Sequence, residues 1–255
     1  MTPSTHFEDL GPLYTSEHSQ TLSRGLQLLE ILSNASARLS INELATASGF
    51  HRSITYRLLR TLEDHQLVSR GHDGLYELGI GLVALARGVQ HDLQTVAVPE
   101  MSALANQFGT MALLVVWDHA SCITLATVEP RDTPAALVQH SGTRHGFATG
   151  APGLAIQSAI TEQQWNAMNQ EDPYRPEAWE AADQGFAVSR NEVIEGVCSV
   201  AAPIHLHALD GYMYPASVGL VFLDSMFTDD DVQKLLGPRV QEAAKRIERE
   251  LGVSV

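Results

Sequence analysis

Residues 40–62, SINELATASGFHRSITYRLLRTL, constrain the fold of this chain more than any other segment. Ser40 and Glu43 have the spacing of a capping box, in which each side chain binds the backbone N–H group of the other residue at the start of a helix. Apolar residues follow at helical spacing until Gly49, and glycine is the residue type that most often ends a helix. The pattern predicts two short helices joined by a glycine turn, the arrangement of a helix-turn-helix.

The second predicted helix has one apolar face and one cationic face. The apolar face is expected to point toward a core and consists of Ile54, Leu58, Leu59 and Leu62. The opposite face offers hydrogen-bond donors suited to phosphate oxygens and base edges, without a carboxylate before Glu63. Many all-α domains also contain two amphipathic helices around a glycine turn, so a DNA-binding and a purely structural interpretation both stay open at this point. The cationic face consists of Arg52, Ser53, Thr55, Tyr56, Arg57 and Arg60.

A β-hairpin is predicted directly after this helix. Residues 67–78 alternate apolar and polar side chains around Asp73-Gly74, and Asp-Gly in such a setting is a strong hairpin signal. A hairpin that follows a helix-turn-helix makes a winged helix, with Arg70 and His72 near the tip of the wing. A preceding helix over residues 21–32 completes the expected three-helix core. Its apolar face is expected to consist of Leu22, Leu26, Leu29, Ile31 and Leu32.

The charge distribution separates this region from the rest of the chain. The 255 residues have a net charge of -14, which by itself argues against a nucleic-acid partner. Residues 21–80, however, contain six arginines and six acidic residues, whereas residues 81–255 contain ten basic and 21 acidic residues. The local field at the cationic helix can therefore be positive although the molecule is acidic. The acidic remainder would weaken non-specific binding, so sequence readout would matter more.

Several classes of protein are not expected from this sequence. The polar N-terminus does not resemble a signal or transit peptide, and no apolar run approaches the roughly 20 residues of a membrane span. With only Cys122 and Cys198, a disulfide framework is excluded and a cytoplasmic location is expected. The GxSxG, P-loop, HExxH and SxxK motifs are absent, and both lysines lie late in the chain, so the protein is not expected to be an enzyme.

The second half of the chain begins with helical patterns. Residues 79–93 predict an unusually apolar helix, which would pack against the second domain or a partner subunit. Residues 96–108 predict a further helix, and shorter ones are expected at 154–159, 161–168 and 177–184. The last helix is expected to run from Asp229 to Leu251, with Thr228 as its N-cap.

Short β-prone runs alternate with these helices. They predict an antiparallel sheet flanked by helices, as in an α+β domain. The expected strands are 111–117, 122–128, 135–140, 186–189, 198–207 and 216–223, with a turn at Asp210-Gly211.

A glycine-rich loop at residues 142–153 is a candidate binding site for a carboxylate. The backbone N–H groups of residues 149–153 precede a helix, and N–H groups at a helix start attract anions. Arg144 and His145 would add positive charge. The alternative is a loop that only caps its helix. Ser189 and Ser199 are candidate hydrogen-bond partners of a ligand, or ordinary satisfied serines of their strands.

His205 and His207 are the candidate metal ligands, because alternate residues of a strand point to the same side. His140 or Cys198 would have to complete the site. The His-x-His pattern is a weak signal, and neither a metal nor another cofactor is expected. Cys198 is expected to be a small buried apolar residue rather than a nucleophile.

From about Leu22 to Gly252 the chain resembles the IclR family of bacterial transcription regulators. The resemblance rests on RGLQLLEIL, LSINELATASGF, HRSITYRLLRTLEDHQLVSR and GLYELGIGLVALA, and further on GTRHGFATGAPGLA and GFAVSRNEVIEGVCSVAAPI. It implies a winged-helix DNA-binding domain and a GAF-like effector domain. It also implies a dimer or a dimer of dimers that binds near-palindromic operators, with small metabolites, often carboxylic or aromatic acids, as effectors.

The resemblance places an effector pocket around the glycine-rich loop, where this chain departs from the family pattern. A usual lysine is replaced by Leu154 and a usual cysteine by Ser199, while an acidic position of the family maps near Ser189. Two usual serines are replaced by Gly219 and Val221, so this wall of the pocket is less polar and the identity of the effector stays open. The candidate effector-binding residues are Leu137, His145, Thr149, Gly150, Ala151, Ser189, Ser199, Gly219 and Val221.

The expected fold is therefore mixed: an N-terminal all-α-type winged helix-turn-helix and a C-terminal α+β, GAF-like domain with an antiparallel sheet. The expected parts are a flexible tail over residues 1–20, a DNA-binding domain over 21–78, a linker helix over 79–95, and an effector-binding and oligomerisation domain over 96–255.

The expected function is that of a sequence-specific DNA-binding transcriptional regulator, repressor or activator, whose operator affinity is controlled by a small-molecule effector. The expected partners are double-stranded DNA, the effector and further copies of the chain in a homodimer or tetramer, with no membrane. The alternative is a small-metabolite enzyme, or a ligand sensor that does not bind DNA. The candidate DNA contacts are Arg52, Ser53, Thr55, Tyr56, Arg57, Arg60, Arg70 and His72.

Overall fold

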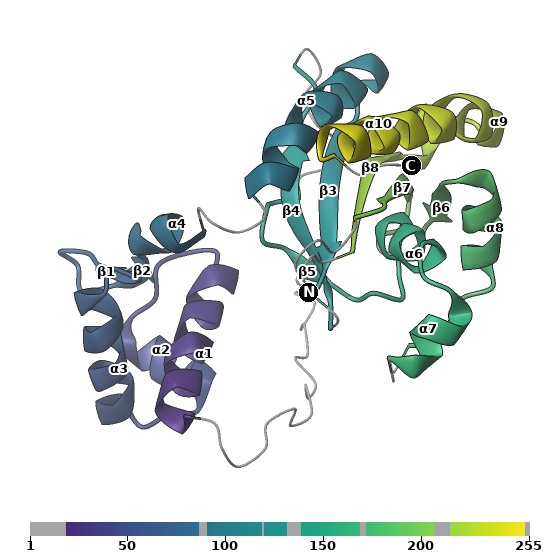
Figure 1. Ribbon diagram of the computed structural model, residues 1–255. Helices are drawn as coiled ribbons and strands as arrows, with labels where there is room; N and C mark the ends of the chain where they lie inside the picture. Colours follow the sequence, from purple (N-terminus) through teal and green to yellow (C-terminus); the bar gives the residue numbers. More distant parts are fainter. Residues whose placement is uncertain are drawn as a thin grey trace. The chain divides into compact units, whose positions relative to one another are not determined.

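We describe the fold from a computed structural model (Figure 1). The structure describes residues 19–86, 91–118, 120–131, 139–168, 172–206 and 215–252. The chain divides into two compact units, Met1–Val89 and Gln90–Val255, which we treat separately. Among the described helices, none combines the length and the apolar character that crossing a bilayer requires. The expected domain boundaries at residues 21, 79 and 96 stay predictions.

The N-terminal unit is a three-helix core with a two-stranded wing, which confirms the predicted winged helix-turn-helix. Leu39 also pairs with Tyr76, so the segment before the second helix adds a bridge to the wing. The elements are α1 (Gln20–Asn34), α2 (Ile41–Ser48), α3 (Arg52–Asp64), β1 (Val68–Arg70), β2 (Tyr76–Leu78) and α4 (Gly81–Ala86).

Local sequence signals fix the turn between α2 and α3. The capping box at the start of α2 is complete: Ser40 N–H donates to Glu43 Oε2 at 2.7 Å, and Glu43 N–H donates to Ser40 Oγ at 3.3 Å. Gly49 ends α2 with φ +69°, a left-handed conformation that costs glycine little. His51 then caps α3, because its Nδ1 accepts the backbone N–H of Ser53 at 3.3 Å. The sequence analysis did not predict this histidine cap.

The core of the N-terminal unit corrects the predicted apolar face of α1. Leu22 and Leu26 are 63% and 49% exposed, whereas Gly25, Leu28 and Leu32 are buried. The exposed residues and the buried residues both have helical spacing, so the periodicity of apolar residues alone could not show which of them face the core. The core that α1 joins consists of Leu28, Leu32, Leu44, Leu58, Leu59, Leu62, Val68 and Tyr76.

The C-terminal unit is an α+β domain with an antiparallel sheet, as predicted, and this sheet has six strands among the described residues. The strand order is β5-β4-β3-β8-β7-β6. β3 lies near the middle, and all seven of its residues are buried. The strands are β3 (Met111–Trp117), β4 (Cys122–Val128), β5 (Arg144–His145), β6 (Ala187–Arg190), β7 (Val197–Ile204) and β8 (Ala216–Leu223).

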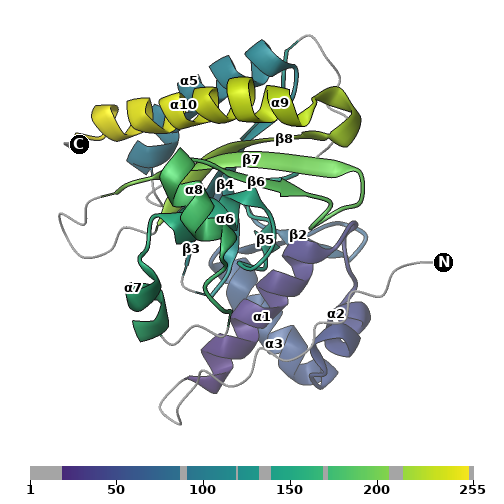
Figure 2. The ribbon, with the colours of Figure 1, turned by 90° about the vertical axis from the view of Figure 1, so that its right-hand side faces the viewer.

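Helices cover both faces of this sheet, as Figure 2 shows. α5 (His91–Phe108) and α10 (Gly237–Glu250) pack on one face over the largest apolar core of the molecule. α6 (Ala151–Ser158) and α8 (Glu177–Gln184) pack on the other face, where small side chains such as Ala187 and Ala201 allow close approach. The short α7 (Glu162–Ala167) contributes Trp165 to the core on this side.

The C-terminal helix differs from the single regular helix predicted for residues 229–251. Thr228 caps it as expected, but α9 (Asp229–Asp231) passes through a π-helical segment, Val232–Leu236, before α10 begins. The N–H of Gly237 donates to the carbonyl of Val232, the i→i+5 bond that defines such a segment. A Cβ at position 237 would lie 2.3 Å from the ring of Phe186, so only glycine fits here.

Other boundaries shift by several residues. α5 begins at His91 rather than Val96, and the apolar helix expected over residues 79–93 is seen as α4 over Gly81–Ala86. The strand predicted at residues 135–140 lies largely outside the described residues. The predicted turn at Asp210-Gly211 lies wholly outside them.

Candidate DNA-binding face and effector loop

α3 presents an exposed cationic face, as its amphipathic sequence predicts. Its hydrophobic side packs into the core through Leu58, Leu59 and Leu62. Within the described residues, no carboxylate forms an ion pair with any arginine of this face, so their charge is available to an anion. The exposed members of the face are Arg52, Ser53, Tyr56, Arg57 and Arg60.

Thr55 does not belong to this face, contrary to the sequence-based prediction. Its exposure is 0%, and its Oγ1 donates to the carbonyl of His51 at 3.4 Å. Thr55 shares the helical stripe of Leu58, Leu59 and Leu62, and its hydroxyl is satisfied inside its own helix. A side chain in this position contacts the core and not a nucleic acid.

The wing places Arg70 and His72 on the surface of the same unit, where their contact with DNA stays a prediction. The guanidinium of Arg70 lies 5.5 Å from the ring centroid of Tyr76, a cation–π distance that places the tip of the side chain over this ring. Arg38 pairs with Asp73 at the turn of the wing, at 3.3 Å. The first contact joins the two strands of the hairpin, and the second ties the turn of the hairpin to the segment before α2.

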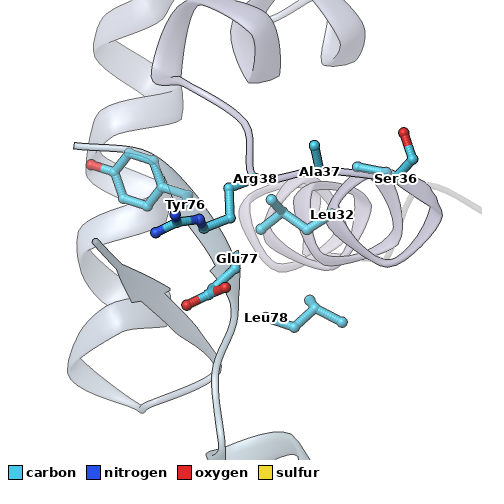
Figure 3. Close-up of a pocket in the computed structure, with 8 residues that line it drawn as sticks. Leu32, Ser36, Ala37, Arg38, Tyr76, Glu77 and Leu78 are labelled. Atoms are coloured by element: carbon cyan, nitrogen blue, oxygen red, sulfur yellow. The ribbon is translucent and has the colours of Figure 1, made fainter. Parts of the chain in front are cut away.

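A shallow groove of about 460 Å³ lies between the α1–α2 turn and β2 (Figure 3). Its charged side chains are one cation, Arg38, and one carboxylate, Glu77. Since these charges offset each other, the groove has no excess charge for a nucleic acid, and we assign no ligand to it.

In the C-terminal unit, strand pairing brings several predicted effector residues onto one face of the sheet. Ser189 pairs with Ser199, and Ser199 pairs with Val221. Gly219 lies two residues from Val221 along β8 and therefore faces the same side. His145 comes from β5, opposite Cys122. Leu137 lies outside the described residues.

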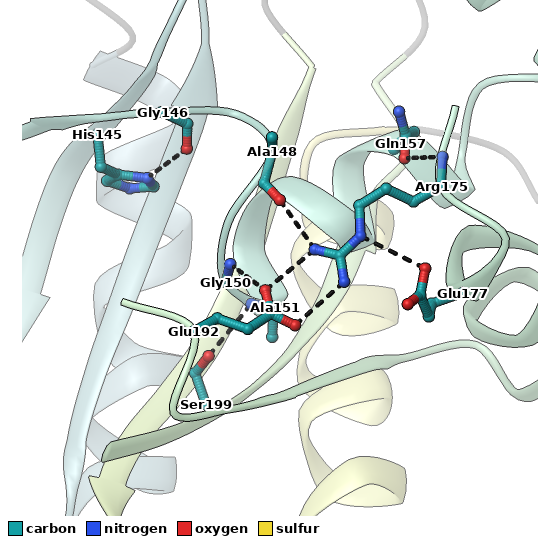
Figure 4. A network of polar contacts seen from close by, with 10 residues as sticks. All are labelled: His145, Gly146, Ala148, Gly150, Ala151, Gln157, Arg175, Glu177, Glu192 and Ser199. Atoms are coloured by element: carbon teal, nitrogen blue, oxygen red, sulfur yellow. Dashed lines mark hydrogen bonds and ion pairs between the residues drawn. The ribbon is translucent and has the colours of Figure 1, made fainter. Parts of the chain in front are cut away.

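The glycine-rich loop ends at the start of α6, three residues earlier than predicted. Gly150 precedes the helix with φ +88°. Its N–H donates to Glu192 Oε2 at 2.8 Å, and the N–H of Ala151 donates to Ser199 Oγ at 3.2 Å (Figure 4). Thr149 is exposed beside them. Protein groups thus accept two of the N–H groups of residues 149–153 that the sequence suggested for an acid, and effector binding by these residues stays a prediction.

An arginine clamps the carboxylate that occupies this position. Arg175 Nη1 lies 3.0 Å from Glu192 Oε2, and Arg175 Nη2 lies 3.0 Å from Glu192 Oε1, a bidentate pair. The same Nη1 donates to the carbonyl of Ala148 at 2.9 Å, and Nε lies 3.5 Å from Glu177 Oε2. The side chains of Arg175 and Glu192 are 19% and 28% exposed, so the pair is largely shielded from water.

These contacts set the protonation states of the pair. Burial acts to raise the pKa of Glu192, but hydrogen bonds from Arg175 and from Gly150 N–H outweigh it and hold that pKa below its usual value. The hydrogen bond to Glu192 raises the pKa of Arg175. Burial lowers the pKa of the nearby His145. The site therefore contains one arginine cation and two carboxylates, Glu192 and Glu177, and the imidazole of His145 favours its neutral form.

An aromatic cluster lies under the loop. The ring centroids of Trp117, Phe147 and Trp165 lie 4.7 to 5.1 Å from one another, and all three side chains are almost fully buried. Trp165 Nε1 donates to the carbonyl of Asp172 at 2.9 Å. The cluster gives this side of the sheet a stiff apolar floor.

The cysteines and histidines that the structure describes form no metal site. Burial raises the pKa of Cys122 to about 12 and of Cys198 to about 11, which does not suit a nucleophile. His205 Nδ1 lies 2.7 Å from Glu248 Oε1. Within the described ranges, no three His, Cys, Asp or Glu side chains are grouped as metal ligands, and His207 lies outside those ranges.

The sequence-based site lacked Arg175, Glu192 and the buried Gln157, whose Oε1 accepts the backbone N–H of Arg175 at 3.0 Å. Arg175 and Glu192 are 17 residues apart, and Glu192 and Gly150 are 42 residues apart. No local spacing rule connects such residues. Neither Arg175 nor Glu192 stands out in the local sequence pattern.

We expect a pH-dependent contribution of Glu192 to stability. A carboxyl group whose pKa is lowered by folding stabilises the fold above its unfolded pKa, near 4.5, and this stability is lost as the pH falls through the folded value. In thermal unfolding, the melting temperature of the wild type should therefore be higher than that of Glu192→Gln at neutral pH. This difference in melting temperature should shrink as the pH falls below about 4.5. Glu195→Gln, an exposed change in the same loop, should give a small difference at every pH. A difference for Glu192→Gln that did not change with pH would contradict the assigned ion pair.

Comparison with protein-family models identifies both units. The IclR helix-turn-helix domain matches residues 21–72, and the bacterial transcriptional regulator IclR C-terminal domain matches residues 87–249. Among curated proteins, the HTH-type transcriptional regulator KipR of Bacillus subtilis (strain 168) is 23% identical over 250 residues, which cover 92% of this chain and 98% of KipR. The glycerol operon regulatory protein of Streptomyces coelicolor is 24% identical over 249 residues, which cover 91% of this chain and 96% of that protein.

Solved structures share the fold over the same extent. An IclR transcriptional regulator from Alicyclobacillus acidocaldarius superposes with a TM-score of 0.76 at 22% identity, covering 91% of this chain and 99% of that one. An IclR homolog from Microbacterium hydrocarbonoxydans, complexed with 4-hydroxybenzoate, superposes with a TM-score of 0.75 at 18% identity, covering 92% of this chain and 100% of that one.

Proposed function

This chain belongs to the IclR family of bacterial DNA-binding transcriptional regulators, and we propose that it recognises a specific operator through α3 and senses a small acid through its C-terminal unit. The observation that carries the DNA-binding part is the face of α3, where three arginines are exposed and, within the described residues, unpaired with carboxylates. The curated relatives are regulators, and no enzymatic family is indicated.

The N-terminal half of α3 would enter the major groove. Arg52, Ser53 and Tyr56 are placed to approach base edges, and Arg57 and Arg60, further along the helix, to approach phosphates. Arg70 and His72 on the wing would contact the flanking backbone or minor groove. The acidic C-terminal unit limits non-specific attraction, so the base contacts would carry much of the preference for one site.

The DNA contacts are testable by substitution. Arg52→Ala should cost about 1–3 kcal/mol of operator binding and relax the preference at one base pair, because a bidentate base contact is lost. Arg57→Ala should weaken binding to all DNA sequences alike, because a phosphate contact is lost. It should also reduce the salt slope, the dependence of log affinity on log salt concentration, by about one. The measurement is fluorescence anisotropy over a salt series on the gene's own upstream DNA. Arg249→Ala, an exposed arginine of α10, is the charge-matched control. Unchanged binding and salt slope in both α3 variants would overturn this assignment.

A near-palindromic operator requires two copies of α3, and α4 supports pairing between chains. In this short helix and just before it, Ile80, Val83 and Leu85 are 75%, 65% and 67% exposed. Such an apolar surface in water favours association. We propose a homodimer, or a tetramer made of two dimers.

The pairing proposal predicts a change in assembly. Val83→Asp should reduce the molar mass measured by light scattering toward that of one chain and weaken operator binding, because a charge would be buried between the copies. Leu235→Asp places the same charge at an exposed leucine of the C-terminal unit and should leave the mass unchanged. A wild type that is already monomeric, or a Val83→Asp variant with unchanged mass, would exclude pairing through α4.

The loop before α6 supports an acid as the effector. The N–H of Gly150 already binds a carboxylate, Arg175 lies beside it, and a relative of the same fold was solved with the aromatic acid 4-hydroxybenzoate. Effector binding would change the arrangement of the paired readers, and such coupling is typically about 1–3 kcal/mol. The sign of this coupling depends on which arrangement the effector favours. That sign decides whether the effector promotes or releases DNA binding, and so whether the protein represses or activates.

A ligand screen tests this part of the proposal. Small carboxylates and phenolic acids, 4-hydroxybenzoate among them, should include a compound that raises the melting temperature and shifts the operator affinity about 5- to 150-fold. The corresponding amides should do neither. Thermal shift followed by gel mobility shift measures both effects. Catalytic turnover of a hit, or stabilisation without any change in DNA affinity, would contradict a regulatory site.

A further inference from the structure

We propose that Glu192 is a resident carboxylate of the effector loop, which an incoming acid must displace, and that Arg175 is the residue that makes the site select acids. This inference rests on the proposed function, because it concerns the same loop. It adds two specificity-determining residues that the sequence pattern did not indicate.

The contacts of Glu192 are those that a ligand carboxylate would make. Its two oxygens receive parallel bonds from Arg175 Nη1 and Nη2 at 3.0 Å, and Oε2 also receives the N–H of Gly150 at 2.8 Å. A bidentate guanidinium and a backbone N–H at a helix start are together a complete carboxylate site. In Figure 4 the carboxylate of Glu192 lies between Gly150 and Arg175, and Ser199 lies beside it.

Glu192 reaches this position from an exposed loop. The pairing of β6 with β7 ends at Arg190 and Cys198, so residues 191–196 form the connection between the two strands. The connection is closed by its own bonds: Asn191 N–H donates to the carbonyl of Val197 at 2.9 Å, and Gly196 N–H donates to Asn191 Oδ1 at 2.7 Å. Neither bond involves Glu192. Its side chain can therefore rotate away without breaking the strand pairing.

Arg175 stays in place when Glu192 leaves. Its Nη1 is bound to the carbonyl of Ala148 and its Nε to Glu177, at 2.9 and 3.5 Å. Its backbone N–H is held by Gln157, a side chain that is 1% exposed. The guanidinium thus belongs to the rigid part of the site, and the carboxylate belongs to the movable part.

The charge of the pair determines what can replace Glu192. A ligand carboxylate would restore the salt bridge, so the exchange leaves the charge beside Arg175 unchanged. A neutral amide would replace the bidentate pair of a guanidinium that is only 19% exposed and leave it, among the described residues, only the 3.5 Å contact with Glu177, which is costly. The site therefore favours a ligand with a single carboxylate over the corresponding amide. Glu192 lowers the affinity for every such acid, because the acid competes with a carboxylate that is already bound.

Removal of Glu192 tests the proposal by chemical rescue. In the full-length protein at neutral pH, Glu192→Ala should melt about 2–4 °C below the wild type. Sodium acetate, replacing sodium chloride at constant ionic strength, should raise its melting temperature saturably to that of the wild type, whereas acetamide should not. The wild type, and Glu195→Ala in the same loop, should not respond to acetate. The double variant Glu192→Ala/Arg175→Lys, which loses the bidentate fork but keeps a charge, should show a weakened response.

A second measurement concerns competition. The affinity for 4-hydroxybenzoate, measured by calorimetry, should be about tenfold higher in Glu192→Ala than in the wild type, because no resident carboxylate opposes binding. Equal affinities, equal rescue by acetamide, or a Glu192→Ala variant that melts like the wild type and ignores acetate would each overturn the inference.

The outcomes separate this inference from the proposed function. Acetate rescue of Glu192→Ala, with wild-type operator affinity unchanged by every acid tested, would support the resident carboxylate and overturn acid sensing. Operator affinity that responds to an acid, with no acetate effect on Glu192→Ala, would support acid sensing and overturn the role of Glu192.

Discussion

The pairing of β7 with both β6 and β8 determines where the polar groups of the C-terminal unit meet. It places Ser199 between Ser189 and Val221, under the first turn of α6. It also positions the β6–β7 connection so that the carboxylate of Glu192 reaches Gly150. A shift of β7 by one residue would turn Ser199 to the opposite face of the sheet and leave the N–H of Ala151 without its acceptor. Register, rather than loop conformation, is thus the primary determinant of this site.

α3 has two roles that depend on opposite sides of one helix. Leu58, Leu59 and Leu62 anchor it to α1, α2 and the wing, while its arginines stay exposed. The anchoring is what makes the exposed face useful, because base contacts require side chains whose backbone does not move. The proposed DNA recognition and the stability of the N-terminal unit therefore depend on the same thirteen residues of α3.

Local signals in the sequence predicted most of the fold. Ser40 and Glu43, Gly49 and the Asp73-Gly74 turn each act over four residues or fewer, and each appears in the structure as expected. Thr55 was misplaced because its hydroxyl suggested exposure, whereas its helical position decided its burial. The ion pair of Arg175 with Glu192 was missed because its partners come together only through the folding of the whole sheet. Sequence pattern predicts elements well, and it predicts contacts between distant segments only where a known family supplies them.

The π-helical segment at Val232–Leu236 has a consequence for comparing this chain with its relatives. An i→i+5 bond takes up one residue more than a regular turn, so the segment contains in effect a single-residue insertion. Deleting one residue there would restore a regular helix and leave the residues on either side facing as they do now, whereas deleting one residue from a regular part of the helix would rotate everything before it by about 100°. Thr228 and the three aspartates of α9 would keep their direction in the first case and face another side of the molecule in the second. An alignment of this C-terminal helix with a regular one needs a one-residue gap between 232 and 236, and an ungapped alignment would pair buried positions with exposed ones.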